Sequence, residues 1–482
     1  MFSGLKRFLT WRWLTIPVVL AAFCFVACGG QPLEPWHTER LSAEFTAADA
    51  DDIATFDDYL ALEERLFEEL YDEVYSEVPT GDKFALIRYS SGSLSDPRTR
   101  DPDYNRTFEL VADEPLGGVL LLHGLTDSPY SLRKLGESLN EAGYWVVGLR
   151  LPGHGTAPSA LKYAHWEDMA AATRLAMRYL AEVVGQKPIH IAGYSNGAAL
   201  AIDHALESSH DPQVKRPASL ILVSPSIGIS AAAAMAGPIA AISKVPGFGR
   251  LAWTQTTPEF DPYKYNSFPI NGGAIARKLT QSVASRVAEL SQTELASSFP
   301  PILVFKSAVD ATVSTDAVVD RLLGRLPDNG NELVLFDINR SAIASVLLVS
   351  DPGPFTARLM KDPSLPFAVT FIANDNPSSM SIVMRHKPAF AAEVTDVDDL
   401  DLEWPRGIIS LSHVALPFPP DDPLYGAIRP ANRGELYLGQ IAIRGERGLM
   451  ILSSDWLLRL RHNPFYQVLE DRVLDWVSTD NQ

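Results

Sequence analysis

A serine lies at the centre of a glycine-flanked pentapeptide, Gly-Tyr-Ser-Asn-Gly, at residues 193–197. An apolar run at 188–192 precedes it, and an alanine-rich run at 198–202 follows it. A strand that enters a helix through Gly-x-Ser-x-Gly strains the serine backbone and holds its oxygen above a helix N-terminus. This setting predicts that Ser195 is a nucleophile. Because the bare pattern also occurs in ordinary turns, the prediction needs partner residues elsewhere in the chain.

A serine nucleophile needs a base that takes its proton and an acid that orients the base. When the serine follows a strand in this way, the acid and then the base come later in the chain. Asp310 is the preferred acid, since it lies five residues after the apolar run 302–305. Asp337, which directly ends another expected strand, is the alternative. Asp316 and Asp320 fall in an expected helix, where we expect them to face solvent.

Three histidines follow Asp310 and qualify as the base by chain order. His413 is preferred, because it ends the expected strand 407–412 and enters a proline-rich loop that would hold its ring. His386 follows an apolar run and remains the rival. His462 lies in a basic stretch near the last expected helix, where a structural role is favoured.

Two backbone N–H groups should stabilise the oxyanion that forms when a serine attacks a carbonyl. Asn196, directly after the nucleophile, is one expected donor. Leu125 is the other, because it lies in the loop after the apolar run 119–122. We expect His123 and His154 to shape the loops around the site rather than to ionise.

The elements that must position these residues alternate between strands and helices. Apolar strands of this kind predict an α/β fold with a mostly parallel sheet covered by helices on both faces. Strands are expected at 84–89, 107–111, 119–122, 144–149, 188–192, 220–223, 302–305, 332–336 and 407–412, and helices at 131–142 and 165–184.

Two insertions interrupt the alternation. Residues 228–299 are rich in prolines and aromatic side chains and predict a cap over a pocket, although a second packed subdomain is the alternative. Residues 340–405 form the second insertion, before His413. It contains two strand-like runs, 346–349 and 367–372, and an acidic run, 396–401, and we expect it to add strands at a sheet edge.

The N-terminal region predicts export. Three basic residues precede an apolar stretch at 13–27, as in a secretory signal. The small residues around Cys28 resemble a bacterial lipobox, and that resemblance implies cleavage before Cys28 and its lipidation. A plain N-terminal membrane anchor is the alternative. After residues 1–27, the segment 28–80 is expected to hold a polar linker, 31–50, and an amphipathic acidic helix within 51–78.

The cysteines agree with an exported, tethered protein. Cys24 and Cys28 are the only cysteines of the chain, so a product cut before Cys28 cannot form an internal disulfide. Gly29 replaces the aspartate that favours retention in the inner membrane in the lipoprotein family. The resemblance therefore implies an anchor in the outer membrane, with the protein facing the periplasm.

Composition limits the partners. The 482 residues are 46% hydrophobic, which suffices for a large core, and the net charge of −18 argues against binding to nucleic acid. Clustered His and Cys residues at metal-ligand spacing are lacking in the sequence.

The chain resembles α/β-hydrolases of the monoglyceride-lipase and carboxylesterase type over about residues 117–320 and 407–475. The resemblance places the enzyme core in 81–227 and 300–482. The matching elements are His123-Gly124-Leu125, the segment Leu-Pro-Gly-His-Gly at 151–155, the pentapeptide at 193–197, Asp310 and His413.

The resemblance implies acyl transfer from an ester or lipid substrate to water. Ser195 would attack the carbonyl, His413 would take the proton, and Asp310 would orient His413. Leu125 and Asn196 would hold the oxyanion without a metal or cofactor. A peptidase or amidase of the serine aminopeptidase type is the alternative enzyme, and a lipid-anchored scaffold without catalysis is the alternative outside enzymes. An apolar acyl group is favoured by the aromatic and aliphatic residues of the predicted cap, Phe248, Leu251, Trp253, Phe260, Tyr263, Tyr265 and Phe268.

Overall fold

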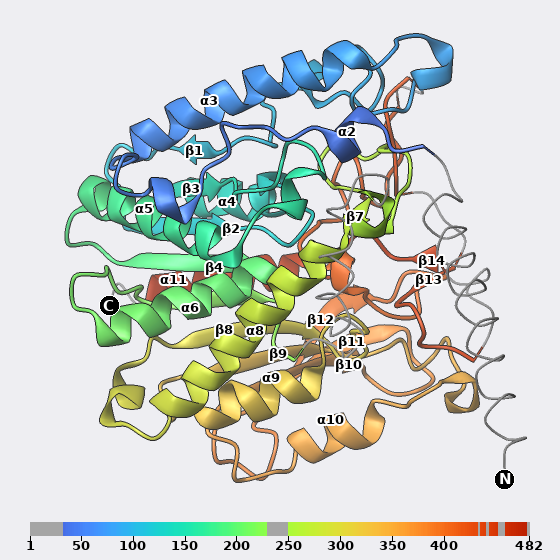
Figure 1. The fold of residues 1–482 in the computed structure, drawn as a ribbon. Helices are drawn as coiled ribbons and strands as arrows, with labels where there is room; N and C mark the ends of the chain where they lie inside the picture. Colours follow the sequence, from blue (N-terminus) through green and yellow to red (C-terminus); the bar gives the residue numbers. More distant parts are fainter. Residues whose placement is uncertain (1–31, 229–248, 432–433, 440–442, 452–457, 480–482) are drawn as a thin grey trace, which may run out of the picture.

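A twisted sheet of ten strands runs through the molecule, in the order β1-β3-β2-β4-β5-β8-β9-β10-β11-β12 (Figure 1). The computed structural model describes residues 32–228, 249–431, 434–439, 443–451 and 458–479. The strands from β3 across to β10 are parallel, whereas β1, β11 and β12 pair antiparallel with their neighbours. The strands are β1 Phe108–Leu110, β2 Gly118–Leu122, β3 Trp145–Leu149, β4 Ile189–Tyr194, β5 Leu220–Val223, β8 Ile302–Ser307, β9 Glu332–Phe336, β10 Ala368–Asn374, β11 Ser381–Lys387 and β12 Asp396–Glu403.

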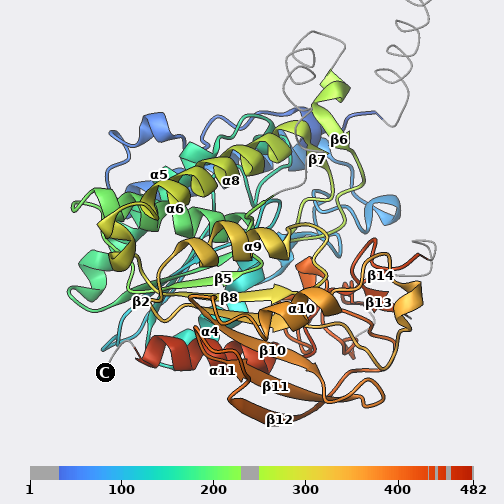
Figure 2. The same cartoon turned by 90° about the horizontal axis from the view of Figure 1, so that it is seen from below.

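Helices cover both faces of this sheet. Figure 2 shows α5, α6, α8 and α9 on one face and α4 and α11 on the other. The two faces carry separate apolar cores, because the side chains of a strand point alternately to opposite sides. The predicted α/β class with helices on both faces is therefore confirmed. The helices are α4 Arg133–Glu141, α5 Trp166–Val184, α6 Asn196–His210, α8 Ile270–Leu290, α9 Thr315–Arg321, α10 Gly353–Leu359 and α11 Tyr466–Thr479.

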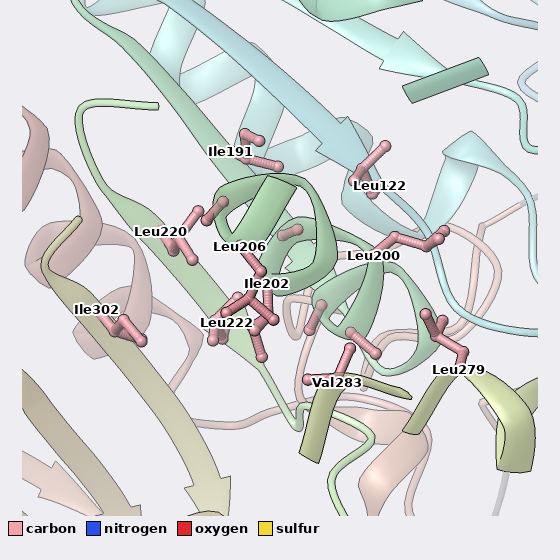
Figure 3. Close-up of a cluster of buried hydrophobic side chains, with 14 of the residues drawn as sticks. Leu122, Ile191, Leu200, Ile202, Leu206, Leu220, Leu222, Leu279, Val283 and Ile302 are labelled. Atoms are coloured by element: carbon pink, nitrogen blue, oxygen red, sulfur yellow. The ribbon is translucent and has the colours of Figure 1, made fainter. Parts of the chain in front are cut away.

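Helix α8 belongs to the main layer and not to a cap. Its Leu279 and Val283 are fully buried and belong to the same core as the strand residues beneath α6. Figure 3 shows both side chains directed toward Leu200 and Ile202 of α6. The prediction that 228–299 forms a cap is therefore wrong for its C-terminal part. An apolar stripe alone does not say whether a helix packs against the sheet or over a pocket, and α8 packs beside α6.

The segment between β5 and α8 is described from Gly249 onward. It forms a short hairpin of β6, Trp253–Gln255, and β7, Phe268–Pro269, and most of its large aromatic side chains are buried. Residues 229–248 of the predicted cap, including Phe248, lie outside the described residues.

The second insertion extends the sheet, as predicted for 340–405. Strand β10 pairs parallel with β9, and β11 and β12 follow it as antiparallel neighbours. Outermost strand β12 carries the acidic run and is largely exposed, and such charges discourage pairing with another chain. The strand expected at 346–349 is wrong, since this segment forms a 3₁₀ turn, Ser345–Leu347, and one isolated bridge from Leu348 to Met450.

The strand expected at 407–412 is also wrong. This segment is irregular, with one isolated bridge from Ile408 to Arg444. Asn339, just beyond β9, instead binds it through backbone and side-chain N–H groups that donate to Ile409 and Ile408 carbonyls at 2.7 and 3.0 Å. Because β10 occupies the edge of β9, the returning chain cannot join the sheet there.

The N-terminal region packs tightly on the core. Helix α3, Phe56–Glu73, buries the apolar stripe predicted within 51–78. Glu63 of the same helix is buried although it is a charged residue, because its carboxylate pairs with Arg150 at 2.9 Å. The described part of the expected linker 31–50 is not a linker, because it contains helix α2, Pro35–Thr38, and a Phe45 side chain that is only 1% exposed.

The first expected strand, 84–89, is replaced by turns. Arg88 is buried there and donates to the Asn105 side chain at 2.9 Å, while the Tyr89 hydroxyl donates to the Thr156 carbonyl at 2.8 Å. The apolar side chains of this segment therefore accompany anchoring to neighbouring loops and not a place in the sheet. Within the described ranges, every helix is too short or too polar to cross a membrane.

Removing the Leu279 side chain should test whether α8 is part of the core. We expect Leu279→Ala to lower the free energy of unfolding by about 2–5 kcal/mol, because it leaves a cavity beneath the helix. Leu295→Ala is the control, since Leu295 is 40% exposed and should change stability by less than about 0.5 kcal/mol. Urea unfolding of both variants measures the difference, and equal stabilities would contradict the assignment of α8.

Candidate active site

Ser195 occupies the turn between β4 and α6. Its backbone angles, φ 54° and ψ −109°, lie in a region that residues other than glycine rarely adopt. A Cβ atom at Gly197 would collide with the Leu122 carbonyl, and one at Gly193 would collide with the Ala198 backbone. The two glycines therefore let the chain make this turn, and the structure confirms the predicted geometry of the pentapeptide.

His413 meets Ser195 from a distant part of the chain. Its Nε2 lies 3.0 Å from Ser195 Oγ, and the histidine begins a 3₁₀ turn, His413–Ala415. The backbone N–H of His413 donates to the Glu446 carboxylate at 2.6 Å, and the Tyr194 hydroxyl donates to its carbonyl at 3.3 Å. These contacts fix the backbone from which the imidazole projects.

Asp310 completes the arrangement from the loop after β8. Its Oδ2 lies 2.7 Å from His413 Nδ1, and its Oδ1 accepts from the backbone N–H groups of Thr312 and Val313 at 2.8 and 3.0 Å. The buried Lys306 ammonium also donates to Oδ2. Asp310 is thus the residue that orients His413, as its place after β8 predicts.

The electrostatics keep Asp310 ionised. Burial alone would raise the pKa of this carboxyl group, but the charges and hydrogen bonds of His413 and Lys306 outweigh burial and hold the pKa well below its usual range. An ionised Asp310 accepts a hydrogen bond from the N–H group at Nδ1 of His413. In the neutral imidazole Nε2 is then left without a proton, and it can accept the proton of Ser195.

The rival residues lie elsewhere. Asp337 binds Arg340 through a salt bridge at 2.9 Å, and His386, on β11, contacts the Thr370 hydroxyl at 2.9 Å. His462 is buried, and its Nδ1 lies 3.3 Å from the Tyr425 carbonyl. Asp316 and Asp320 are exposed on α9, as predicted. None of these side chains contacts Ser195 in the described structure.

The loop that carries Leu125 is pinned by His123. The Leu151 N–H donates to His123 Nε2 at 3.0 Å, so Nδ1 holds the proton and donates to the Gly124 carbonyl at 2.9 Å. Burial, together with His154, lowers the pKa of His123 well below its usual value. His123 is therefore neutral and structural, as predicted. His154 likewise contacts its own loop, with Nδ1 3.1 Å from the Pro152 carbonyl.

The two expected oxyanion donors lie on segments that meet at the turn. Asn196 is the first residue of α6, so its N–H has no acceptor within the helix. The start of the Leu125 loop abuts the same helix end, because the carbonyls of Leu122 and His123 are the atoms nearest a Cβ at Gly197. The roles of Leu125 and Asn196 remain predictions.

Sequence reasoning missed the residues that support these loops. Lys264 donates to Asp127 at 2.8 Å, and the Tyr265 N–H donates to the Thr126 carbonyl at 2.8 Å, so the segment before β7 holds the Leu125 loop. Only Lys306 gave a signal in the sequence, because it is a lysine that directly follows four apolar residues of the same strand.

A further contact places a hydroxyl beside the nucleophile. Ser226 Oγ lies 3.3 Å from Ser195 Oγ, and the Thr280 hydroxyl of α8 donates to the Ser226 carbonyl at 2.8 Å. A serine after a strand is too common for its sequence to mark this role. Among the described residues, we find no group of three or more His, Cys, Asp and Glu side chains that could hold a metal ion.

The sheet order, the strained serine after β4 and the acid after β8 together define the α/β-hydrolase fold, and the chain has this fold. The family model described as serine aminopeptidase, S33, matches residues 113–338, which is less than half of the chain. The match includes Ser195 and Asp310 and ends before His413.

The chain is similar to several lipolytic enzymes. It is 32% identical over 117 residues to the thermostable monoacylglycerol lipase of Bacillus sp. (strain H-257), a match that covers 24% of this chain and 44% of that relative. Among solved structures, the monoacylglycerol lipase of Paleococcus ferrophilus is 18% identical, with a TM-score of 0.36 over 48% of this chain and 88% of that one. A soluble variant of monoglyceride lipase from Saccharomyces cerevisiae is 14% identical, with a TM-score of 0.37 over 48% and 82%.

The pH dependence of stability should reveal the ionised, buried Asp310. Because its folded pKa lies below the unfolded value of about 3.9, its contribution is present above that pH and is lost as the pH falls. We expect Asp310→Asn to lower the free energy of unfolding by about 3–5 kcal/mol near pH 7, with a difference from wild type that shrinks below about pH 4.

Asp337→Asn is the matched control for this measurement. Burial raises the pKa of Asp337 despite its bond to Arg340, so its difference from wild type should instead shrink as the pH rises. Denaturant unfolding of both variants between pH 3 and pH 8 would follow the two trends. A difference for Asp310→Asn that grows toward low pH would contradict the assignment.

Proposed function

We propose that the protein is a serine hydrolase that cleaves carboxylic esters through an acyl-enzyme on Ser195. The observation that carries this proposal is the continuous hydrogen-bonded chain from Asp310 through His413 to Ser195, with contacts of 2.7 and 3.0 Å. A strained serine beside an imidazole that a buried carboxylate orients is the arrangement that activates a hydroxyl for attack on a carbonyl.

The reaction follows from this geometry. Ser195 Oγ attacks the ester carbonyl while its proton moves to His413 Nε2, and Asp310 stabilises the resulting imidazolium. The N–H groups of Leu125 and Asn196 hold the oxyanion. His413 then protonates the departing alcohol. Water enters, gives its proton to His413 and attacks the acyl-enzyme, which releases the acid and restores Ser195.

An ester is favoured over a peptide as the substrate. The similarity to a monoacylglycerol lipase supports an ester, whereas the family description of a serine aminopeptidase supports a peptide. Recognition of a free amino terminus needs an unpaired carboxylate near the site. The described carboxylates there are engaged, since Asp127 pairs with Lys264 and Glu446 pairs with Arg459. A glycerol ester of a fatty acid is the substrate class that we propose, and an aminoacyl substrate is the second candidate.

A fluorophosphonate probe and two substrate series test this proposal. We expect the probe to label wild-type protein, and Ser195→Ala to abolish labelling and to lower ester hydrolysis by at least about 10³-fold, because the nucleophile is lost. Thr312→Ser is a conservative change that leaves the reacting atoms in place. It is the control for the effects of expressing and purifying a variant protein.

p-Nitrophenyl esters of increasing chain length and aminoacyl p-nitroanilides, assayed side by side, separate the two substrate classes. We expect kcat/KM to be higher for the esters at every chain length tested. Preferential cleavage of the anilides would favour the aminopeptidase reading. A failure to label the wild type, or equal labelling of Ser195→Ala, would contradict serine catalysis altogether.

We also propose that the enzyme works outside the cytoplasm on a lipid tether at Cys28. This proposal rests on the leader 1–27 and the small residues around Cys28, all of which lie outside the described residues. An outer-membrane anchor facing the periplasm is the location that Gly29 favours. A tether of this kind would bring Ser195 close to membrane-derived esters.

Metabolic labelling tests the tether. In a bacterial host grown with an alkyne fatty acid, we expect wild-type protein to incorporate the label and Cys28→Ser to lose both the label and cleavage of the leader. Cys24→Ser is the matched control and should be labelled like the wild type. A Cys28→Ser protein that remains processed and membrane-bound would instead indicate a plain signal or anchor.

A further inference from the structure

Lys306 is a buried cation at the centre of the site. It lies on β8, its side chain is 0% exposed, and its ammonium group donates to Asp310 Oδ2 and, at 2.9 Å, to the Val313 carbonyl. Both acceptors belong to the loop that presents the acid to His413. Lys306 therefore joins the rigid sheet to this loop at two points.

Burial of this charge is costly for folding. Burial lowers the pKa of Lys306, and the charge and hydrogen bond of Asp310, with a further contribution from Glu446, act in the opposite direction. Replacing a buried ion pair by apolar side chains is often neutral or stabilising. Lys306 is therefore poorly explained by stability alone, and its contact with the acid of the triad suggests a role in the chemistry.

The lysine and the histidine bind the same carboxylate oxygen. Oδ2 of Asp310 accepts from Lys306 Nζ and from His413 Nδ1, while Oδ1 is occupied by the N–H groups of Thr312 and Val313. All of these donors together prevent rotation of the carboxylate. They also place the positive charge of Lys306 next to the ring that must become an imidazolium during the reaction.

Other charged and titratable groups face His413 from the neighbouring segments. Glu446, which follows the short strand β13, Arg444–Gly445, accepts from the His413 N–H and pairs with Arg459 of β14, Leu458–Arg459. Asp127 and Lys264 form a second pair in the neighbouring loops. The buried Tyr194 ring lies 5.5 Å from the His413 ring. The carboxylates are therefore each matched by a fixed cation, and His413 is the group whose charge changes.

We propose that Lys306 is a positioning residue of the triad, which fixes Asp310 for His413 and sets how readily His413 accepts the serine proton. This inference rests on the proposed function and assigns the lysine a role in its pH dependence. Lys306 lies on the same carboxylate oxygen as the ring and repels the positive charge that forms there when His413 takes the serine proton.

Removal of the Lys306 charge should therefore narrow the pH range in which the enzyme is active, from the acidic side. In Lys306→Met and in Lys306→Gln, the imidazolium loses a repelling neighbour. We expect the acidic limb of the pH profile of kcat/KM, which reports the base in the free enzyme, to move up by about one pH unit. Lys306→Gln keeps a hydrogen-bond donor beside Oδ2 without the charge. It therefore separates the electrostatic role from the role in holding the loop.

The test measures kcat/KM for p-nitrophenyl butyrate between pH 4 and pH 9 by pH-stat titration. Lys278→Met, at an exposed position on α8, is the control and should keep the wild-type profile. Glu446→Gln removes a negative charge that contacts the His413 backbone, so its acidic limb should move down. This variant also keeps the inference testable if neither Lys306 variant folds.

The possible results are distinct. An upward shift in both Lys306 variants, with a downward shift in Glu446→Gln, supports the inference. A lower plateau with an acidic limb that coincides with that of the wild type would show that Lys306 only holds the loop and would overturn it, as would a limb in Glu446→Gln that does not move down. A wild-type protein that fails to hydrolyse the ester at any pH would refute the proposed function itself.

Discussion

The carboxylate of Asp310 is the point on which the site depends. It accepts hydrogen bonds from Lys306, His413 and the backbone N–H groups of Thr312 and Val313, and it is almost completely buried. A charge in such surroundings is stable only when every donor is in place. The sheet supplies Lys306 directly, so the position of the acid, and through it that of His413, is tied to the most rigid part of the molecule.

The insertion between β9 and His413 shows how this arrangement tolerates added chain. Strands β10, β11 and β12 extend the sheet away from the site, and the chain then returns to it without joining the sheet. The returning segment is held by hydrogen bonds to Asn339 beyond β9 and to Ser307 at the end of β8, whose hydroxyl donates to the Leu411 carbonyl at 2.9 Å. Glu446 then fixes the backbone of His413. A base delivered from an irregular segment is therefore positioned as firmly as one delivered from a strand.

The sequence predicted which side chains meet at the candidate site better than the elements that support them. Ser195 could be found because its turn demands glycines at two fixed positions, and Asp310 and His413 could be found because chain order restricts the choice. The strand expected at 407–412 was wrong, since the inserted β10 takes its place beside β9. Helix α8 was assigned to a cap, because an apolar stripe does not say which surface it will cover.

The supporting contacts depend on tertiary structure and could not be predicted. Glu446 lies 33 residues after His413 in the sequence, and Lys264 reaches Asp127 across 137 residues. No local pattern marks such pairs. Lys306 is the exception, because a lysine within a fully buried strand requires a partner, and Asp310, four residues later, is the nearest carboxylate in the chain.

Direct observation of an acyl group on Ser195 tests the central claim, which is nucleophilic catalysis by this serine. Protein mixed with excess p-nitrophenyl butyrate and quenched in acid within milliseconds can be digested and examined by mass spectrometry. We predict that the peptide containing Ser195 carries one butyryl group, and that its appearance coincides with an initial burst of p-nitrophenol. Turnover of the ester without this adduct, or an adduct on another residue, would contradict the mechanism.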